Sequence, residues 1–282
     1  MMDGNPPLWT HTVIGGSGVG LHVHEVGNRA GRPLLFIHSC SECRLIWLKQ
    51  LQSDLADEFR LVAIDLRGHG LSEKPPEALA YTDSKVWADD IHAVMTTLDL
   101  DHPILIVGGY SGIVACDYLR VHGDGKLGGL NLTSAISKFG VYEPRAVISA
   151  EAQALGPGLS STVTEESVRT LIEALRMCVH GFPSEVDLYF WLGFHTLVPP
   201  YVREAMYSRV VDNDDVLRQI TKPVLLTHGY RDVVVFPEAT KQHARLIPHA
   251  KISFYSEVGH FPYWEHPDRF NSELRAFANA CP

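Results

Sequence analysis

The sequence of 282 residues lacks any run of lysine or arginine, and it lacks any apolar stretch longer than a strand. Its formal net charge of −9 is spread along the chain, which gives no basic surface for nucleic acid or an anionic membrane. Residues 1–7 lack the basic and apolar regions of a signal peptide, and no segment reaches the length of a membrane span. We therefore expect a cytoplasmic protein whose partner is a small molecule, and we leave open whether it forms a homodimer.

Cysteine is also scarce, because the chain has five scattered cysteines, an odd number that suits reduced thiols better than a disulfide framework. Cys40 and Cys43 form a C-x-x-C pair that follows a predicted strand, which is the context of a redox pair. A zinc site would need two more ligands, and no matching second pair exists, so we predict no metal. We interpret the pair as two partly buried thiols of a loop.

Short apolar runs alternate with helical patterns, which predicts a mostly parallel sheet with helices on both faces. Thr12–Val26 contains a glycine-rich turn and predicts an antiparallel hairpin. Helices are predicted over Ile46–Asp57 and over Ser84–Leu98, the second with Asp83 as its N-cap. The predicted buried strands are Leu34–Ile37, Leu61–Ile64, Ile104–Val107, Gly129–Leu132, Val224–Thr227 and Lys251–Tyr255.

The pattern changes after about Ser137, where helical segments punctuated by prolines follow one another to about Asn213. A helical block inserted between strands is typical of a lid over an active site. We therefore predict a core made of residues 1–137 and 214–282 and a helical cap made of residues 138–213. The predicted cap helices are Glu143–Ala154, Glu165–Val179, Ser184–Phe194 and Tyr201–Val210.

Several motifs, in a fixed order, resemble the α/β-hydrolase superfamily. Residues 65–72 (DLRGHGLS) resemble its D-x-R-G-x-G-x-S turn, in which we interpret His69 as a turn-stabilising residue, and His38-Ser39 stands where the family has His-Gly before its oxyanion loop. Asp232 in H-G-Y-R-D and His260 in V-G-H match the positions of the catalytic acid and histidine. The resemblance implies an eight-stranded, mostly parallel sheet with a cap like that of epoxide hydrolases and haloperoxidase-like esterases.

The nucleophile elbow of this family normally reads G-x-S-x-G-G, and here the sequence departs from it. A gapless match puts Gly109 at the nucleophile position, and glycine has no side chain that could attack a substrate. A shift by one residue puts Tyr110 at the tip. A shift by two gives Ser111, but then Ile113 stands where the turn requires a small residue. We prefer Gly109 and keep Tyr110 and Ser111 as alternatives.

The remaining catalytic groups suffice for base chemistry. Asp232 would fix the tautomer of His260 and stabilise its protonated form, which leaves the other ring nitrogen as a base. The resemblance places oxyanion donors at the backbone N–H groups of Cys40 and Tyr110. We therefore predict a cofactor-independent enzyme that uses this dyad for lyase, isomerase or cyclase chemistry or for water activation.

Two other functions stay open at this point. One is ester or lactone hydrolysis through Ser111 or through a displaced nucleophile, for which Ser39, Cys40 and Ser41 on the opposite wall are candidates. The other is a ligand-binding pseudoenzyme on the same fold.

For the substrate pocket we predict His38, Ser39, Trp191 and Phe261. Trp191 belongs to an aromatic run on a predicted cap helix, and Phe261 directly follows His260. Aromatic side chains of this kind indicate an apolar substrate.

Overall fold

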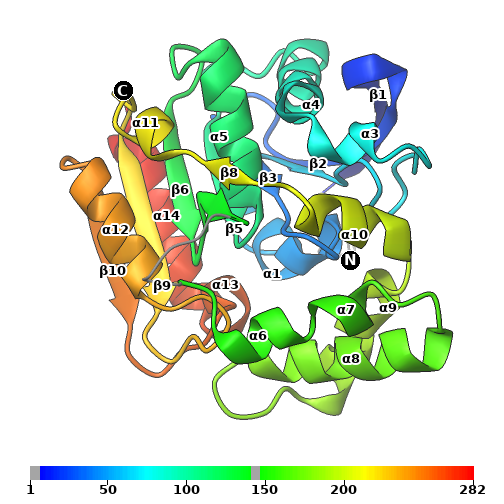
Figure 1. The fold of residues 1–282 in the computed structure, drawn as a ribbon. Helices are drawn as coiled ribbons and strands as arrows, with labels where there is room; N and C mark the ends of the chain where they lie inside the picture. The colour runs from blue at the N-terminus through cyan, green and yellow to red at the C-terminus, as the bar shows by residue number, and fades with distance from the viewer. Residues whose placement is uncertain (1–6, 141–146) are drawn as a thin grey trace, which may run out of the picture.

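The computed structural model describes residues 7–140 and 147–282, and its centre is an eight-stranded sheet with the order β1-β2-β4-β3-β5-β6-β9-β10 (Figure 1). β1 and β2 form the predicted antiparallel hairpin, and β2 is also antiparallel to β4. All other neighbours pair in parallel, which confirms the predicted fold class. The strands are β1 (Leu8–Ile14), β2 (Gly20–Gly27), β3 (Pro33–Ile37), β4 (Arg60–Ile64), β5 (Ile104–Gly108), β6 (Gly129–Thr133), β9 (Val224–Gly229) and β10 (Lys251–Tyr255).

Successive residues of the central strands are buried in two different cores, one on each face of the sheet. Leu35 of β3 belongs to the core that contains Trp87 of α4 (Ser84–Thr97). The next residue, Phe36, belongs to the core that contains Trp47 and the apolar side of α14 (Pro267–Ala280). Figure 1 accordingly shows α4 and α5 (Ser111–His122) on one face and α14 on the other. The continuous apolar runs in the sequence are explained by this double burial.

Asp83 caps α4 as predicted, because it accepts the Lys85 N–H at 2.8 Å.

The predicted helix over Ile46–Asp57 is wrong as a single element. Ser53 interrupts this segment, because its hydroxyl donates to Gln50 O at 2.7 Å and accepts the Leu55 N–H at 3.2 Å. Three short elements result, namely η2 (Arg44–Trp47), α1 (Leu48–Leu51) and α2 (Leu55–Glu58). The other short elements are η1 (Gly16–Gly18), α3 (Leu79–Thr82), α11 (Asp214–Leu217), α12 (Glu238–Leu246) and α13 (Pro262–Glu265).

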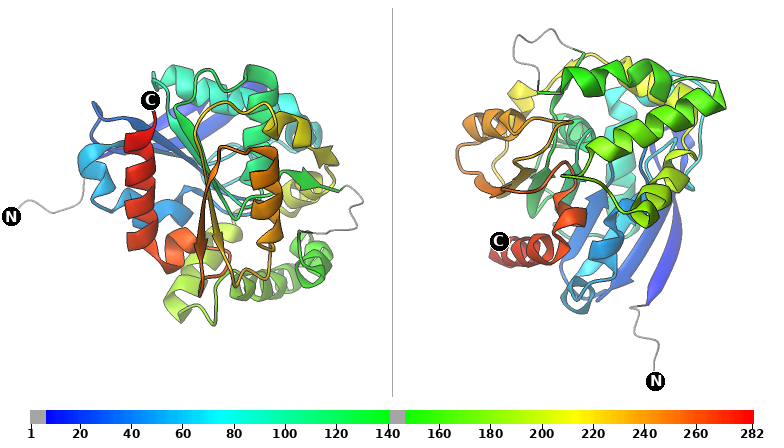
Figure 2. Two further views of the ribbon diagram at one scale, coloured as in Figure 1. Left: turned by 90° about the vertical axis from the view of Figure 1, so that its left-hand side faces the viewer. Right: turned by 90° about the horizontal axis from the view of Figure 1, so that it is seen from below.

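A group of helices follows β6, and most of it lies beyond the sheet at the bottom of Figure 1. Its first described helix begins after Ser149, which caps it by accepting the Ala152 N–H at 3.1 Å. The predicted start of this helix, Glu143, lies outside the described residues. Along the chain this group lies between β7 (Lys138–Phe139) and β8 (Val211–Asp212), two short strands that pair with each other. Its helices are α6 (Ala150–Ala154), α7 (Gly156–Leu159), α8 (Thr164–Met177), α9 (Glu185–His195) and α10 (Pro200–Tyr207). Figure 2 shows α6 to α9 as a layer beside the main body. No helix of the described ranges is both long and apolar enough to cross a membrane.

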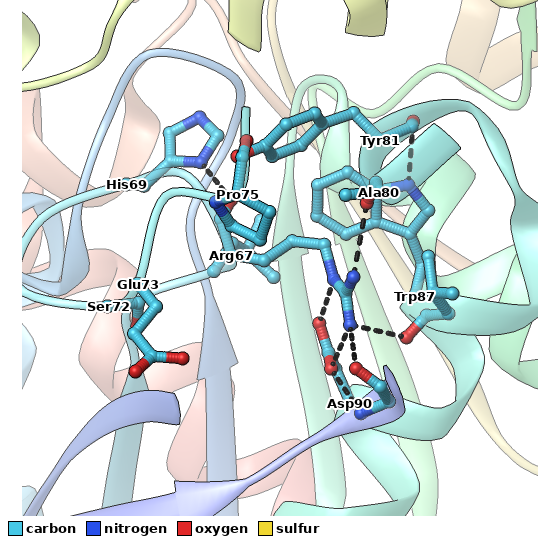
Figure 3. A network of polar contacts seen from close by, with 12 residues as sticks. Arg67, His69, Ser72, Glu73, Pro75, Ala80, Tyr81, Trp87 and Asp90 are labelled. Carbon is cyan, nitrogen blue, oxygen red and sulfur yellow. Dashed lines mark hydrogen bonds and ion pairs between the residues drawn. The ribbon is translucent and has the colours of Figure 1, made fainter. Parts of the chain in front are cut away.

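The turn at residues 65–72 is anchored by a buried ion pair (Figure 3). Arg67 and Asp90 are both fully buried, and Nε and Nη2 of Arg67 each donate to the Asp90 carboxylate at 2.7 Å. Nη2 also donates to Gly16 O at 2.8 Å. His69 receives the Ser41 N–H on its Nε2 at 3.1 Å, so the turn also holds the loop that follows β3. This geometry supports a structural role for His69.

We expect Arg67→Ala to lower the free energy of unfolding by about 3–5 kcal/mol, because it leaves the Asp90 carboxylate buried without its partner. The matched control is Lys85→Ala, which removes the exposed ion pair between Lys85 and Asp89 on the same helix and should cost less than about 1 kcal/mol. Urea unfolding of both variants measures the difference. Equal losses in the two variants would contradict the anchoring role of the buried pair.

Candidate active site

Asp232 and His260 follow the neighbouring parallel strands β9 and β10 and meet beyond their carboxyl ends. His260 Nδ1 lies 2.7 Å from Asp232 Oδ2. The other oxygen of Asp232 accepts the N–H groups of Val234 and Val235 at 2.8 and 2.9 Å. These backbone bonds fix the carboxylate, so His260 donates from Nδ1 and keeps Nε2 available as a base.

His228 is a further partner of this carboxylate that the sequence reasoning did not select. It is fully buried, and its Nε2 lies 3.1 Å from Asp232 Oδ2 and 2.9 Å from Val235 O. Its Nδ1 lies 2.8 Å from the Thr240 hydroxyl. These partners assign a tautomer with hydrogen on Nε2, so Asp232 accepts from two imidazoles. The signal was present, because His228 opens the same H-G-Y-R-D string that ends in Asp232.

The pKa values of the pair move in opposite directions. Burial alone would lower the pKa of His260, but the charge and hydrogen bond of Asp232 outweigh it and raise that pKa above the ordinary 6.5. Burial alone would raise the pKa of Asp232, but His260 and His228 hold it well below its usual range. Asp232 is therefore ionised and His260 is a strengthened base.

Gly109 lies between β5 and α5 with φ +52°, in the left-handed region that side chains rarely adopt. A Cβ built on Gly109 would lie 3.2 Å from His260 Nε2 and 2.6 Å from Ser39 Oγ. The tip of the strand-to-helix turn is thus residue 109, and it faces the base. This geometry supports the gapless match of the elbow.

The two alternative elbow residues direct their hydroxyls elsewhere. Ser111 is fully buried, and its hydroxyl lies within hydrogen-bond distance of Ile37 O at 3.0 Å and Gly108 O at 2.8 Å while accepting the Gly108 N–H at 2.9 Å. The Tyr110 hydroxyl donates to Met206 O at 2.9 Å, and burial raises the pKa of this phenol. Both hydroxyls are committed to the backbone, which argues against either one as the nucleophile.

Of the two predicted oxyanion donors, one is already hydrogen-bonded and the other is not. The Tyr110 N–H donates to Ser39 Oγ at 2.9 Å. The Cys40 N–H has no hydrogen-bond partner within residues 7–140 and 147–282. One donor is therefore free for a substrate oxygen, and the other already holds the side chain of Ser39.

The thiols and the other loop serine are poorly suited to attack a substrate. Cys40 and Cys43 are both free thiols, and burial raises their pKa values to about 11 and about 12. Both are therefore protonated at neutral pH. Ser41 accepts a hydrogen bond from Arg203 Nε at 2.8 Å and is buried.

Glu42 is a buried carboxyl group beside His260 that the sequence reasoning passed over. Its Oε2 accepts the Ser39 N–H at 2.8 Å, and burial raises its pKa to about 7 against the opposing effects of this bond and of His260. The loop turns back at Ser41, which has a φ of +65°, and the Glu42 N–H donates to Ser39 O at 3.4 Å. Nothing in the local sequence pattern announces that turn.

A cavity of about 1170 Å³ opens above the dyad. Ser39, Gly109 and His260 form its floor, and its apolar lining includes Phe139, Leu155, Leu159, Leu171, Leu175 and Met177. Polar groups that line it include Glu42, Ser137, His195, Glu204 and Tyr207. Within the described ranges no group of three histidine, cysteine or acidic side chains is arranged to hold a metal ion. The site can therefore enclose a mainly apolar molecule over a single base.

Of the four residues predicted for the substrate pocket, Ser39 and Phe261 line this cavity, whereas His38 and Trp191 do not. His38 is fully buried behind the loop, because its Nε2 accepts the Leu66 N–H at 3.0 Å. Trp191 packs instead between the rings of Phe261 and Trp264, with centroid separations of 5.4 and 5.5 Å. The Trp191 ring therefore packs against Phe261, which lines the cavity, and does not line the cavity itself.

Residues 34–273 match the Alpha/beta hydrolase family, so the chain belongs to this family of the α/β-hydrolase fold. It is similar to an esterase from Rhodococcus sp. ECU1013, with 33% identity, a TM-score of 0.90, and 97% of this chain and 99% of that chain covered. It is also 28% identical to the non-heme chloroperoxidase CPO-A1 of Kitasatospora aureofaciens, over 88% of this chain and 93% of the relative. An AB hydrolase superfamily protein of Bacillus subtilis is 25% identical over 93% of this chain and 96% of its own length.

We expect Glu42→Gln to move the acid limb of the enzyme's pH–rate profile to lower pH. His260 must be neutral to act as a base, so activity falls as pH drops through its raised pKa, and the nearby Glu42 charge contributes to that rise. The wild type should also show a second titration near 7 from Glu42 itself, which the variant loses.

The measurement is kcat/KM against pH for both proteins. Glutamine keeps an oxygen that can accept the Ser39 N–H, so the loop should stay in place. Superimposable profiles would show that Glu42 is not coupled to the base.

Proposed function

We propose that this protein hydrolyses a small, mainly apolar ester and that His260, oriented by Asp232, is the general base. The observation that carries the proposal is the position of His260 Nε2, which lies at the cavity floor only 3.2 Å from the Cβ position of residue 109. The dyad is thus aimed at the place where a reacting group approaches the elbow tip. General-base assistance of this kind contributes roughly 10²–10⁴-fold to a rate.

The cavity supports a substrate of moderate size. Its volume of about 1170 Å³ is slightly above the roughly 300–1,000 Å³ of typical small-molecule sites, and aliphatic side chains from α7 and α8 supply much of its lining. The free Cys40 N–H is placed in the loop beside the base and can stabilise a carbonyl oxygen that becomes negative. Similarity to an esterase at 33% identity supports an ester as the substrate class.

Proton abstraction from carbon is the second candidate, because Gly109 offers no side chain for covalent catalysis. The same base and oxyanion donor would then stabilise an enolate in a lyase-, isomerase- or cyclase-type reaction. Exchange of substrate hydrogen with deuterium oxide, without release of an acid and an alcohol, would favour this chemistry over hydrolysis. Ligand binding without turnover would favour a pseudoenzyme.

We expect His260→Ala to lower kcat/KM for p-nitrophenyl esters by roughly 10²–10⁴-fold, because it removes the base. Ser111→Ala is the matched control, since it removes a buried hydroxyl committed to backbone groups. It should cost about 1–3 kcal/mol of stability but leave the activity of folded protein within a few-fold of the wild type. Retained activity in His260→Ala would contradict the proposed function, as would loss of activity in well-folded Ser111→Ala.

We expect Asp232→Asn to lower the rate by no more than His260→Ala does, within the same range of roughly 10²–10⁴-fold, and to lower the pKa of His260. The asparagine cannot stabilise protonated imidazole, so the acid limb of any residual activity should move to lower pH. Rate measurements across the pH range test both effects. A shift to higher pH would mean that Asp232 does not raise the pKa of His260.

A further inference from the structure

Two departures from the family pattern meet in space at the cavity floor. The pattern has glycine at position 39 and serine at position 109, and this chain has Ser39 and Gly109. Residues 39 and 109 follow the neighbouring parallel strands β3 and β5. A Cβ on Gly109 would lie 2.6 Å from Ser39 Oγ, which is closer than two unbonded atoms can approach without a shift. The serine hydroxyl therefore occupies the space that an elbow side chain would need.

Other groups around the floor fit a reactive oxygen at Ser39. The Tyr110 N–H, at the N-terminus of the 12-residue helix α5, donates to Ser39 Oγ at 2.9 Å. Hydrogen bonding to an oxygen favours its anionic form, and a helix N-terminus adds to this effect. Glu42 fixes the backbone of Ser39 through the 2.8 Å bond to its N–H. Ser39 is partly exposed and lines the cavity.

We propose that Ser39 is the nucleophile of this enzyme, so that the catalytic hydroxyl has moved from the elbow to the opposite loop. The proposal rests on the proposed ester hydrolysis and names the atom that His260 activates. His260 Nε2 and Ser39 Oγ both lie within 3.2 Å of one point, the Cβ position of residue 109. The two atoms are not hydrogen-bonded to each other in the structure, and the proposal therefore requires a rotation of the Ser39 side chain that brings its hydroxyl to the base. Such contacts often tighten only when substrate is bound.

The reaction proceeds in two balanced halves. His260 Nε2 takes the proton of Ser39 Oγ as the oxygen bonds to the ester carbonyl carbon, and the Cys40 N–H donates a hydrogen bond to the carbonyl oxygen that becomes negative. The bond between this carbon and the alkoxy oxygen breaks, and His260 gives its proton to the departing alcohol. Water then attacks the acyl group on Ser39 with His260 again as base, which releases the carboxylic acid and restores the serine.

The first experiment is labelling of wild-type protein with a fluorophosphonate probe, followed by peptide mass spectrometry. The proposal predicts a label on Ser39, lost in Ser39→Ala and retained in Ser161→Ala, a control serine of the helical region whose hydroxyl bonds to Glu166. Ser39→Ala should also lower esterase kcat/KM on the order of 10³-fold or more, with unchanged thermal unfolding. A label on another residue, or no label, would overturn the proposal.

The reciprocal exchange is the sharper test. Gly109→Ser alone should lower activity, because its Cβ crowds Ser39 Oγ at 2.6 Å. The double variant Ser39→Gly with Gly109→Ser relieves this contact and should recover activity, with the label now on residue 109. Failure of the folded double variant to react with the probe would show that the two positions are not exchangeable and would overturn the proposal.

The outcomes separate this inference from the proposed function. If Ser39→Ala hydrolyses esters as well as or better than the wild type while His260→Ala does not, the base acts on water. The only role of the Ser39 hydroxyl is then to accept the hydrogen bond from the Tyr110 N–H. In that case the proposal for Ser39 fails and the proposed function stands. If both variants keep full activity, both proposals fail.

Discussion

The buried carboxylate of Asp232 is the interaction on which this site depends. A lone carboxylate at that depth would be strongly destabilising, and two imidazoles together with two backbone N–H groups compensate for it. The same contacts fix the orientation of His260 and raise its pKa. Stability of the charge and strength of the base therefore have one physical origin, which lies at the ends of β9 and β10.

The elbow is subject to a second constraint, which is lack of space. At φ +52° residue 109 turns the chain sharply between β5 and α5, and the position of its missing side chain is bounded by His260 and Ser39. Ser111 and Tyr110 stabilise the turn through bonds to Gly108 and Met206. Hydrogen bonds of residues 110 and 111 thus hold this strand-to-helix turn, and residue 109 within it has no side chain.

Much of the fold could be predicted from the sequence, because strands buried on both faces leave continuous apolar runs such as Leu34–Ile37. The meeting of Asp232 and His260 was also predictable, since parallel neighbouring strands end at one edge. The interrupted helix after Trp47 was not, because it depends on local hydrogen bonds of Ser53.

The pocket was predicted less well than the dyad. Glu42 is placed by a left-handed residue, Ser41, that the sequence does not mark. The direction of Trp191 depends on packing against Phe261 and Trp264, which helical periodicity alone does not determine. Likewise His38 satisfies the Leu66 N–H instead of facing the substrate. Side-chain direction at a wall built from several helices is a tertiary property.

Asp232 makes His260 a strengthened base and leaves its Nε2 free. The most direct test is a ¹⁵N-edited NMR titration of the imidazole of His260 in the ligand-free protein. We expect a neutral tautomer with hydrogen on Nδ1 and a pKa above 6.5. A neutral form with hydrogen on Nε2, or a pKa below 6.5, would contradict it.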